Sequence, residues 1–286
     1  MPFSPQLMLL GLLLPALVAG LSFWLLKKIL PADMANRWAP SICLIGGFLS
    51  GYFLSDVGPW PPTSHWHWLP VAVFPAIIFG PLSREFKLGP AMRSLLFVPP
   101  AFLAVWLLVP TWDSLEPSRL VQMIAWGGFL WLVTLLLEPL TDRISAPPLA
   151  AVFTGTLLGG AIVVFQGDSA RFAQVLLTAM CGMGGLFLAV TVIARKNHLL
   201  GLACSLTLLV GGSILIGQAN TFSNVPLASY LLIILAPLTM WISRTRPLAH
   251  WSESAKTTVT IAIPAVTCLA AILLAEWFEP MLLGRR

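Results

Sequence analysis

Long apolar stretches alternate with short polar connections along the whole chain of 286 residues. A membrane-spanning helix needs about 20 predominantly apolar residues, and ten stretches meet or approach that length. The pattern therefore predicts an all-α polytopic membrane protein with about ten transmembrane helices. The predicted spans are 6–26, 39–56, 68–82, 94–112, 119–140, 148–166, 172–194, 199–218, 226–243 and 258–277.

The third stretch, WLPVAVFPAIIFGPL, differs from the others because it is short and rich in proline. Proline removes a backbone donor and kinks a helix, which a membrane tolerates only where other groups satisfy the freed carbonyl. The third span is predicted to cross, and it is the one candidate for a broken or re-entrant helix.

Composition supports a single transmembrane domain over residues 1–286. The chain is 58% hydrophobic and 9% charged, with a mean hydropathy of +0.89, whereas soluble domains carry roughly 25% charged residues. The 16 basic residues are dispersed among the spans, which argues against nucleic acid and leaves the lipid bilayer as the certain partner. Lys27 and Lys28 follow the first apolar stretch, so that stretch is predicted to be a retained span and not a cleaved signal.

Basic residues also predict an orientation. The odd-numbered loops hold twelve of the 16, whereas the even-numbered loops hold only Arg119 and Arg171. Cytoplasmic loops carry an excess of Lys and Arg, so both termini are expected on the non-cytoplasmic side. We expect an integral protein of a bacterial cytoplasmic membrane.

The first four predicted spans resemble the last four. LIGGFLSG in the second span matches LVGGSILIG in the eighth, and FPAIIFGPLSR in the third matches APLTMWISR in the ninth. The matching pairs, separated by 165, 165, 162 and 164 residues, are Gly20 with Gly185, Gly46 with Gly211, Pro75 with Pro237, and Pro100 with Pro264.

These matches predict a parallel 4+2+4 repeat, with copies at 1–112 and 169–286 joined by a central helix pair at 113–168. Because the copies begin an even number of spans apart, they share one orientation and imply a pseudo-two-fold axis along the membrane normal. Chance similarity between apolar segments rich in Gly, Pro and Leu is the alternative explanation.

Small residues and prolines carry physical roles in such a bundle. Small residues let helix backbones approach closely in lipid, so Gly47 with Gly51 and Gly155 with Gly159 are predicted sites of close helix crossing. Prolines at membrane depth are candidate hinges around a cavity, with static kinks as the alternative. The candidate hinges are Pro75, Pro100, Pro237 and Pro264.

The segment SHWHW, residues 64–68, is the most conspicuous candidate for chemistry. His65 and His67 on an extended segment would point to one side, and Asp56 could add a carboxylate for a transition metal. His198 and His250 fall in predicted cytoplasmic loops, so the set of ligands is incomplete.

Tryptophans around this segment favour a different role. Trp60, Trp66 and Trp68 match the aromatic belt of a membrane interface. We therefore expect interfacial packing, with no metal and no cofactor; a metal or haem site and a ligand-binding loop are the alternatives. The four cysteines lie inside apolar stretches without CxxC spacing and are expected to pack in the core.

Charged residues deep in a membrane are usually functional, but the middles of the predicted spans contain none. Glu138, Glu276 and Asp56 lie near span ends and are expected at the interface. Glu138 is the candidate for a proton or cation role. Further candidates for ligand contact are Gln122, Gln166, Gln218, Trp126 and Trp131.

No phosphate-binding loop, H-E-x-x-H motif or nucleophile elbow occurs in the sequence, which favours a non-enzymatic role. The leading hypothesis is a small-molecule transporter with its cavity between the two four-helix copies. The alternative is a non-catalytic subunit or assembly factor of a larger membrane complex, or a homo-oligomer. A membrane-embedded enzyme acting on lipid or quinone is the third hypothesis.

Overall fold

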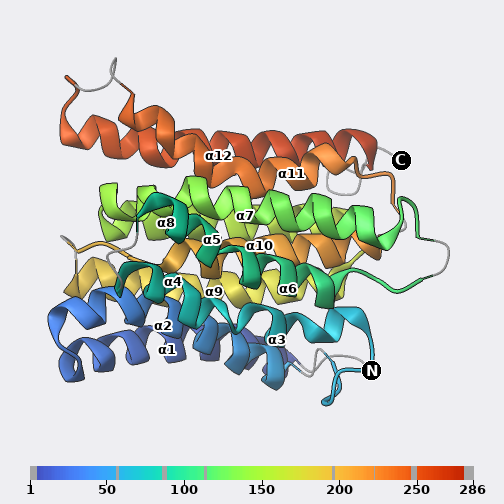
Figure 1. Ribbon diagram of the computed structural model, residues 1–286, viewed down its shortest axis with the longest axis horizontal. Coiled ribbons are helices and arrows are strands. Elements are labelled where there is room, and N and C mark those ends of the chain that lie inside the picture. Colours follow the sequence, from blue (N-terminus) through green and yellow to red (C-terminus); the bar gives the residue numbers. More distant parts are fainter. Residues whose placement is uncertain are drawn as a thin grey trace.

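The protein is a bundle of helices that run along one common axis (Figure 1). The computed structural model describes residues 5–55, 58–85, 89–112, 115–194, 197–221, 223–245 and 250–279, and these contain no β-strand. The predicted all-α class is confirmed. The helices are α1 Pro5–Ile29, α2 Ala32–Leu54, η1 His65–Trp68, α3 Leu69–Val73, α4 Ala76–Glu85, α5 Pro90–Leu96, α6 Val98–Leu108, α7 Arg119–Arg143, α8 Ala146–Gln166, α9 Ala170–Ile193, α10 Leu202–Ala219, α11 Leu227–Leu235, η2 Ala236–Arg244 and α12 Glu253–Phe278.

Nine helical segments in the described part of the chain are long and apolar enough to cross a membrane. They coincide with nine of the ten predicted spans. The second predicted span is also a helix, α2, but it lies outside that set and carries Asp33 and Arg37 in its first turns. Its 23 residues would extend about 35 Å at 1.5 Å per residue. The count of ten crossings therefore depends on α2 and stays a prediction.

Three of the crossings are built from two consecutive helical pieces. The third is interrupted at Phe74 and Pro75 between α3 and α4, as the sequence predicts for a broken helix. The fourth is interrupted at Phe97, and the ninth changes from the α-helix α11 to the 3₁₀-helix η2. A 3₁₀ stretch of nine residues is unusual, because such runs seldom exceed 3–4 residues.

The four candidate hinge prolines lie in three different settings. Pro75 and Pro237 stand at the interruptions of the third and ninth crossings. Pro100 lies in the first turn of α6, after the break at Phe97, and Pro264 lies inside the continuous helix α12. Motion at any of them stays a prediction.

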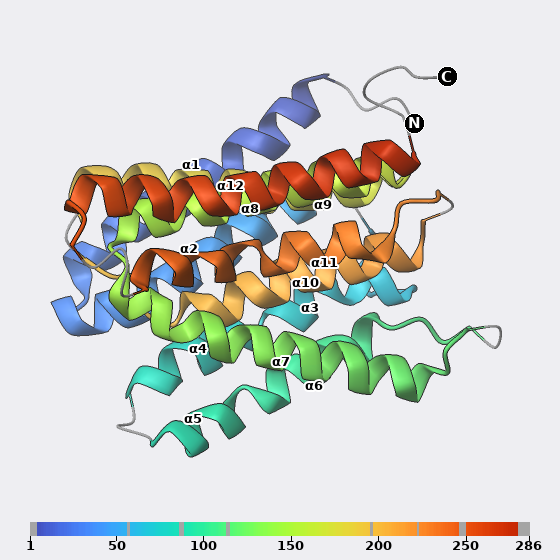
Figure 2. The ribbon, with the colours of Figure 1, turned by 90° about the horizontal axis from the view of Figure 1, so that it is seen from above.

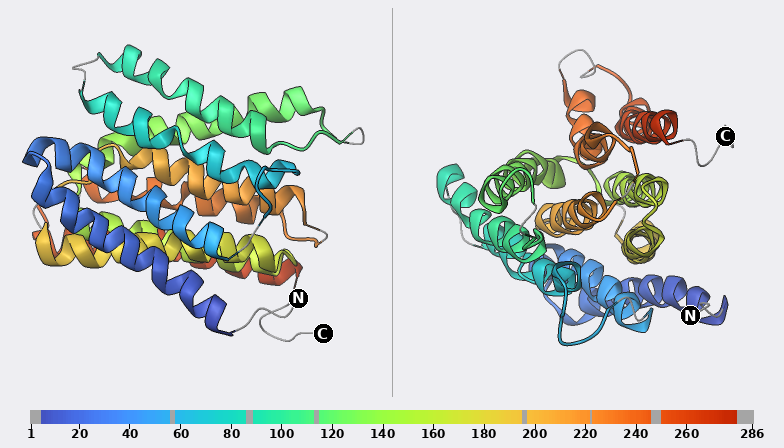
Figure 3. Two further views of the ribbon diagram at one scale, coloured as in Figure 1. Left: turned by 90° about the horizontal axis from the view of Figure 1, so that it is seen from below. Right: turned by 90° about the vertical axis from the view of Figure 1, so that its right-hand side faces the viewer.

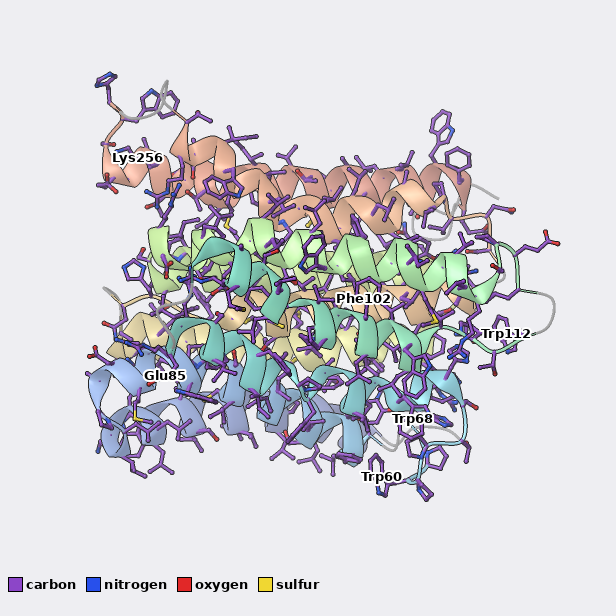
Figure 4. The ribbon with its side chains drawn as sticks, in the orientation of Figure 1. Trp60, Trp68, Glu85, Phe102, Trp112 and Lys256 are labelled. Carbon is purple, nitrogen blue, oxygen red and sulfur yellow. The ribbon has the colours of Figure 1, made fainter. Side chains whose placement is uncertain are left out.

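The two ends of the bundle differ in their side chains. Trp60, Trp68 and Trp112 lie at one end, which we call the tryptophan end, and Glu85 and Lys256 lie at the opposite end (Figure 4). The first turn of α1 and the last turn of α12 both lie at the tryptophan end (Figure 1). An even number of passes requires this arrangement.

Helix α10 occupies the centre of the bundle. It packs against α2, α3, α4, α6, α7, α8, α9 and α11, and 16 of its 18 residues are buried. The end-on view in Figure 3 shows it, in gold, surrounded by the other helices. A helix that is apolar on all sides is suited to this position. Cys204 on α10 is buried with Cys43 and Cys268, as predicted, and Cys181 is half-buried.

Glycines let pairs of helices touch through their backbones. A methyl group added at Gly185 of α9 would overlap the Ala16 carbonyl of α1, and one at Gly20 would lie 3.2 Å from the Gly185 carbonyl oxygen. Likewise, α4 meets the start of α10 where Gly80 abuts Gly201, whose φ of 74° favours glycine. Such contacts replace the hydrophobic driving force that lipid does not supply.

Of the predicted close crossings, one pair is confirmed. Gly47 and Gly51 on α2 face Pro15 of α1, and Gly51 also faces Thr178 of α9. The pairing of Gly155 with Gly159 was wrong in part, because a Cβ at Gly155 meets no atom within 4 Å. Gly155 instead borders a cavity beside α12.

The predicted duplication is not decided by these contacts. The matching glycines Gly20 and Gly185 touch each other, and the matching prolines Pro75 and Pro237 both interrupt helices. However, the matching helices α2 and α10 have different surroundings, since α10 is central and α2 packs mainly against α1 and α9. The 4+2+4 repeat stays a prediction that a superposition of the two copies tests.

We predict that Gly185→Ala weakens the contact between α1 and α9, because the added methyl group forces the helices apart. The expected loss in the free energy of unfolding is about 1–3 kcal/mol, the usual cost of overpacking. The neighbouring Gly184→Ala is the matched control, since a Cβ at Gly184 meets nothing within 4 Å. Unfolding in mixed micelles, followed by circular dichroism, measures both; equal losses would contradict the backbone contact.

Candidate functional site

The SHWHW segment forms a turn of 3₁₀-helix that is held by its own histidines. The Nδ1 atom of His67 accepts hydrogen bonds from the backbone N–H groups of Thr63 and Ser64, at 3.2 and 3.1 Å. The Nε2 atom of His65 lies 3.0 Å from the amide nitrogen of Asn220, at the end of α10. Both imidazoles therefore have protein partners that position the loop.

The metal alternative can be compared with this geometry. Within the described ranges, no three His, Cys, Asp or Glu side chains gather where they could hold a metal ion. Asp56, the predicted third ligand, lies outside the described residues. Since the Nδ1 atom of His67 accepts from two backbone donors, it is not free to bind a metal.

Trp66 links this loop to the start of α9. Its ring lies 3.7 Å from that of His67 and 5.5 Å from that of Phe172, measured between centroids. The guanidinium carbon of Arg171 lies 5.3 Å from the centroid of the Trp66 ring, a cation–π contact. The loop between α2 and α3 is therefore fastened to α9 at the tryptophan end.

A buried ion pair joins α4 to α7 near the opposite end. The Nε atom of Arg84 donates to Oε1 of Glu138 at 2.5 Å, and its Nη2 atom donates to the Glu138 backbone carbonyl at 2.9 Å. Asp142 completes the network through Arg84 Nη1. The side chains of Arg84 and Glu138 are only 9% and 3% exposed, so water screens this pair little.

Glu138 was expected at the interface; it is buried within the bundle near the end opposite the tryptophans, and its depth in a membrane stays a prediction. The residue is 2% exposed because α4 brings Arg84 and Ser83 against it. Its second oxygen, Oε2, is buried without a hydrogen-bond partner among the described residues. A proton or cation role for Glu138 stays a prediction.

The remaining candidates lie at separate places on α7, α8 and α10. Gln122 donates to the Pro117 carbonyl at 3.2 Å, and the indole N–H of Trp131 donates to the Ser94 carbonyl at 2.9 Å. Trp126 packs edge-on against Phe129, and Gln218 is half-buried at the end of α10. Trp131 therefore bonds to α5, and Trp126 packs on a residue of its own helix, α7. A contact of either tryptophan with a ligand stays a prediction.

Gln166 and Glu276 meet at the tryptophan end, between α8 and α12. The Nε2 atom of Gln166 donates to Oε2 of Glu276 at 2.9 Å and lies 3.3 Å from the Ile272 carbonyl. Gln166 is fully buried and Glu276 is 5% exposed, and the expected interfacial position of Glu276 stays a prediction. Next to this pair lies an apolar cavity of about 310 Å³, bordered by Gly155, Pro264 and Ile272.

A larger cavity, of about 460 Å³, lies between α1 and α9, which are the first helices of the two proposed copies. The end of α8 and Ser55, at the end of α2, complete its wall. Its polar lining consists of Arg171, Gln174, Ser55 and Thr178, and its apolar lining includes Leu12, Phe165 and Leu177. We call it the α1–α9 cavity.

The course of α1 explains why this space exists. Below the cavity, α1 and α9 touch at Ala16 and Gly185, whereas the first turns of α1 lean away from the bundle (Figures 2 and 3). Pro15 lies between these two parts. Because proline has no N–H, the carbonyl of Gly11 loses its usual donor within the helix, and Gly11 lines the cavity.

By contrast, the cavities described beside the central helix are small. The cavity beside Thr207 and Val210 of α10 measures about 10 Å³, which is room for roughly one water molecule. The α1–α9 cavity is therefore the better candidate for a ligand site, because it combines volume with polar groups.

No known family model matches the sequence, and no curated protein matches it. The class of protein therefore follows from the fold: the apolar helices define an integral, multi-pass membrane protein.

Sequence reasoning missed the charged and polar residues of the buried ion pair and of the α1–α9 cavity. Arg84 and Arg171 were counted only as orientation charges, and Ser55 and Gln174 were not singled out. Arg84 follows the proline-rich third stretch, and Arg171 is one of only two basic residues in the even-numbered loops. That isolation was the one available signal for Arg171.

We predict that Arg84→Met is strongly destabilising because it leaves the Glu138 carboxylate buried without its partner. The expected loss in the free energy of unfolding is about 3–5 kcal/mol. The control is Arg37→Met, since the pair between Arg37 and Glu85 is 30% and 41% exposed and is expected to contribute at most about 1 kcal/mol.

A double variant separates charge from packing. Arg84→Met combined with Glu138→Leu removes both charges and is expected to recover most of the stability in the same micelle unfolding assay. Failure of the double variant to recover, together with equal losses for Arg37→Met and Arg84→Met, would show that the ion pair is not what joins α4 to α7.

Proposed function

We propose that this protein is a membrane transporter for small molecules and that the α1–α9 cavity is its substrate site. The observation that carries the proposal is that the cavity lies between α1 and α9, the first helices of the two proposed copies, with α8 and Ser55 completing its wall. Substrate sites of transporters built from repeats lie at the interface between the repeats. A volume of about 460 Å³ falls within the range of roughly 300–1,000 Å³ that is usual for ligand pockets.

The interrupted helices support a protein that moves. The third and ninth crossings both contain a break at a proline, and the ninth continues as a 3₁₀-helix. Mid-helix 3₁₀ stretches often mark functional hinges. In the proposed mechanism, these breaks let one half of the bundle tilt relative to the other while the site stays in place.

The contacts between helices at the two ends of the bundle can serve as the two gates that such a mechanism needs. The ion pair of Arg84 with Glu138 holds α4 against α7 at the opposite end, while the Trp66 loop holds the start of α9 at the tryptophan end. In this proposal, transport alternates between opening one gate and opening the other.

We also propose that the tryptophan end faces away from the cytoplasm. Among the described residues, Lys27, Lys28, Arg84, Arg143 and Arg244 occupy last turns of helices at the opposite end. This distribution is what the positive-inside rule expects of the cytoplasmic face.

Labelling of single cysteines tests the orientation and the path of the third crossing. In a variant without native cysteines, Thr63→Cys is expected to react with an impermeant maleimide added outside intact cells. Gly89→Cys, where a Cβ meets nothing within 4 Å, is expected to react only after the membrane is permeabilised. Reaction of both from one side would mean that the third segment does not cross.

A cavity-filling variant tests the transport proposal. Leu177→Trp places an indole in the α1–α9 cavity and is expected to abolish the uptake of at least one solute by proteoliposomes. Uptake is measured by mass spectrometry against a broad panel of metabolites. Leu188→Trp, on the same helix at a position that is 64% exposed, is the matched control and is expected to transport normally.

Two results would count against transport. The first is a panel in which no solute accumulates faster than in empty liposomes. The second is uptake that Leu177→Trp leaves unchanged, which would place the substrate path elsewhere. Stoichiometric partner proteins in the native preparation would then favour the alternative of a subunit in a larger complex.

A further inference from the structure

We infer that the α1–α9 cavity takes an amphipathic anion, with a phosphate or carboxylate head and a single apolar chain. This inference rests on the proposed substrate site and names its ligand class. The head would lie at Arg171, Gln174 and Ser55, and the chain would lie along Phe165 and Leu177, all of which line the cavity.

Arg171 is held in place without an ion-pair partner in the part of the chain that the structure describes. Its guanidinium group contacts the Trp66 ring, and no carboxylate among the described residues forms an ion pair with it. A guanidinium that stacks on an aromatic ring keeps its N–H donors at its edge, where they can bind an oxyanion in bidentate fashion. The contact with Trp66 therefore fixes the position of a cation that has no ion-pair partner among the described residues, at the wall of the cavity.

Ser55 supplies a second, independent sign of a ligand site. Its side chain is 7% exposed and lines the cavity, and its hydroxyl is buried without a hydrogen-bond partner among the described residues. A buried polar group without a partner costs about 1–3 kcal/mol. An oxyanion in the cavity would accept the hydrogen bond that this hydroxyl can donate.

The start of α9 adds donors to the same wall. Ala170 and Arg171, the first two residues of α9, both line the cavity. The first N–H groups of a helix have no acceptor within it and carry a partial positive charge. The N-cap residue Ser169 makes no capping hydrogen bond with its side chain, so an anion can take that role.

The apolar part of the ligand follows from the rest of the lining. A second cavity, of about 240 Å³, shares Phe165, Ala173 and Leu177 with the α1–α9 cavity and extends to Ile162. Phe165 is 44% exposed on the face of α8, at a helix position where lipid would contact it. An alkyl chain can therefore run from the polar wall along α8 and α9 toward the bilayer.

Binding of dodecyl phosphate tests this inference without a transport assay. The whole protein is placed in nanodiscs of phosphatidylcholine and titrated with dodecyl phosphate, and native mass spectrometry counts the bound molecules. Arg171→Gln is expected to weaken binding about tenfold or more, the usual effect of losing a charge-assisted hydrogen bond. Arg171→Lys keeps the charge and is expected to lose less.

Arg119→Gln is the matched control, since Arg119 is the other described basic residue of the even-numbered loops and donates to the Trp106 carbonyl outside the cavity. It is expected to bind within about twofold of the unchanged protein, because a rim charge away from the ligand contributes little. Equal weakening by Arg119→Gln and Arg171→Gln would overturn the assignment of Arg171.

Other ligands test each half of the amphiphile and its source. Dodecanol binding as tightly as dodecyl phosphate would overturn the anionic head, and inorganic phosphate binding as tightly would overturn the apolar chain. Competition by phosphatidylglycerol in the nanodisc would support the inference with a membrane lipid as the source. If phosphatidylglycerol does not compete and dodecyl phosphate still binds, the inference is supported with a free amphiphile as the source of the ligand.

The two proposals can fail separately. If dodecyl phosphate does not bind but Leu177→Trp still blocks uptake of some solute, the transport function holds and the ligand class is wrong. If dodecyl phosphate binds at Arg171 and no solute is transported, the binding site holds and the transport function is wrong.

Discussion

The contact between the backbones of α1 and α9 is the interaction on which the rest of the bundle depends. In lipid, apolar side chains gain nothing by leaving the solvent, so helices associate through close packing of small residues. Gly185 allows the Ala16 carbonyl to approach the α9 backbone, and Gly80 allows α4 to reach Gly201 in the same way. One contact joins the outer helices of the two proposed copies, and the other joins the first copy to the central helix.

Polar groups are arranged around these contacts so that charge stays near the ends. Arg84, Glu138 and Asp142 pair at one end, and Arg171 lies on Trp66 at the other. A buried ion pair adds little net stability compared with apolar residues of similar size. Its value here is directional, because the fork of Arg84 fixes which face of α7 meets α4.

Much of the fold follows from the sequence because membrane helices are encoded locally. Length and hydropathy were sufficient to find the nine helical segments of the described chain that are long and apolar enough to cross a membrane, and the prolines around Pro75 pointed to the interruption of the third segment. The candidate site did not follow, because it depends on which helices become neighbours. Arg84 and Glu138 are 54 residues apart, and Ser55 and the first turn of α9 line one cavity only because α1, α2 and α9 pack together.

The course of α1 connects a close backbone contact with the α1–α9 cavity. Gly185 draws the middle of α1 onto α9, and Pro15 lets the preceding turns diverge (Figure 2). Because α1 contacts α9 at Ala16 and diverges from it before Pro15, a space opens between the two helices. The first residues of α9 line this space. The small residues that bring α1 and α9 into contact thus also determine where the two helices diverge. For this reason, the polar wall of the cavity lies next to the contact between Ala16 and Gly185, and the same residues of α1 and α9 determine both features.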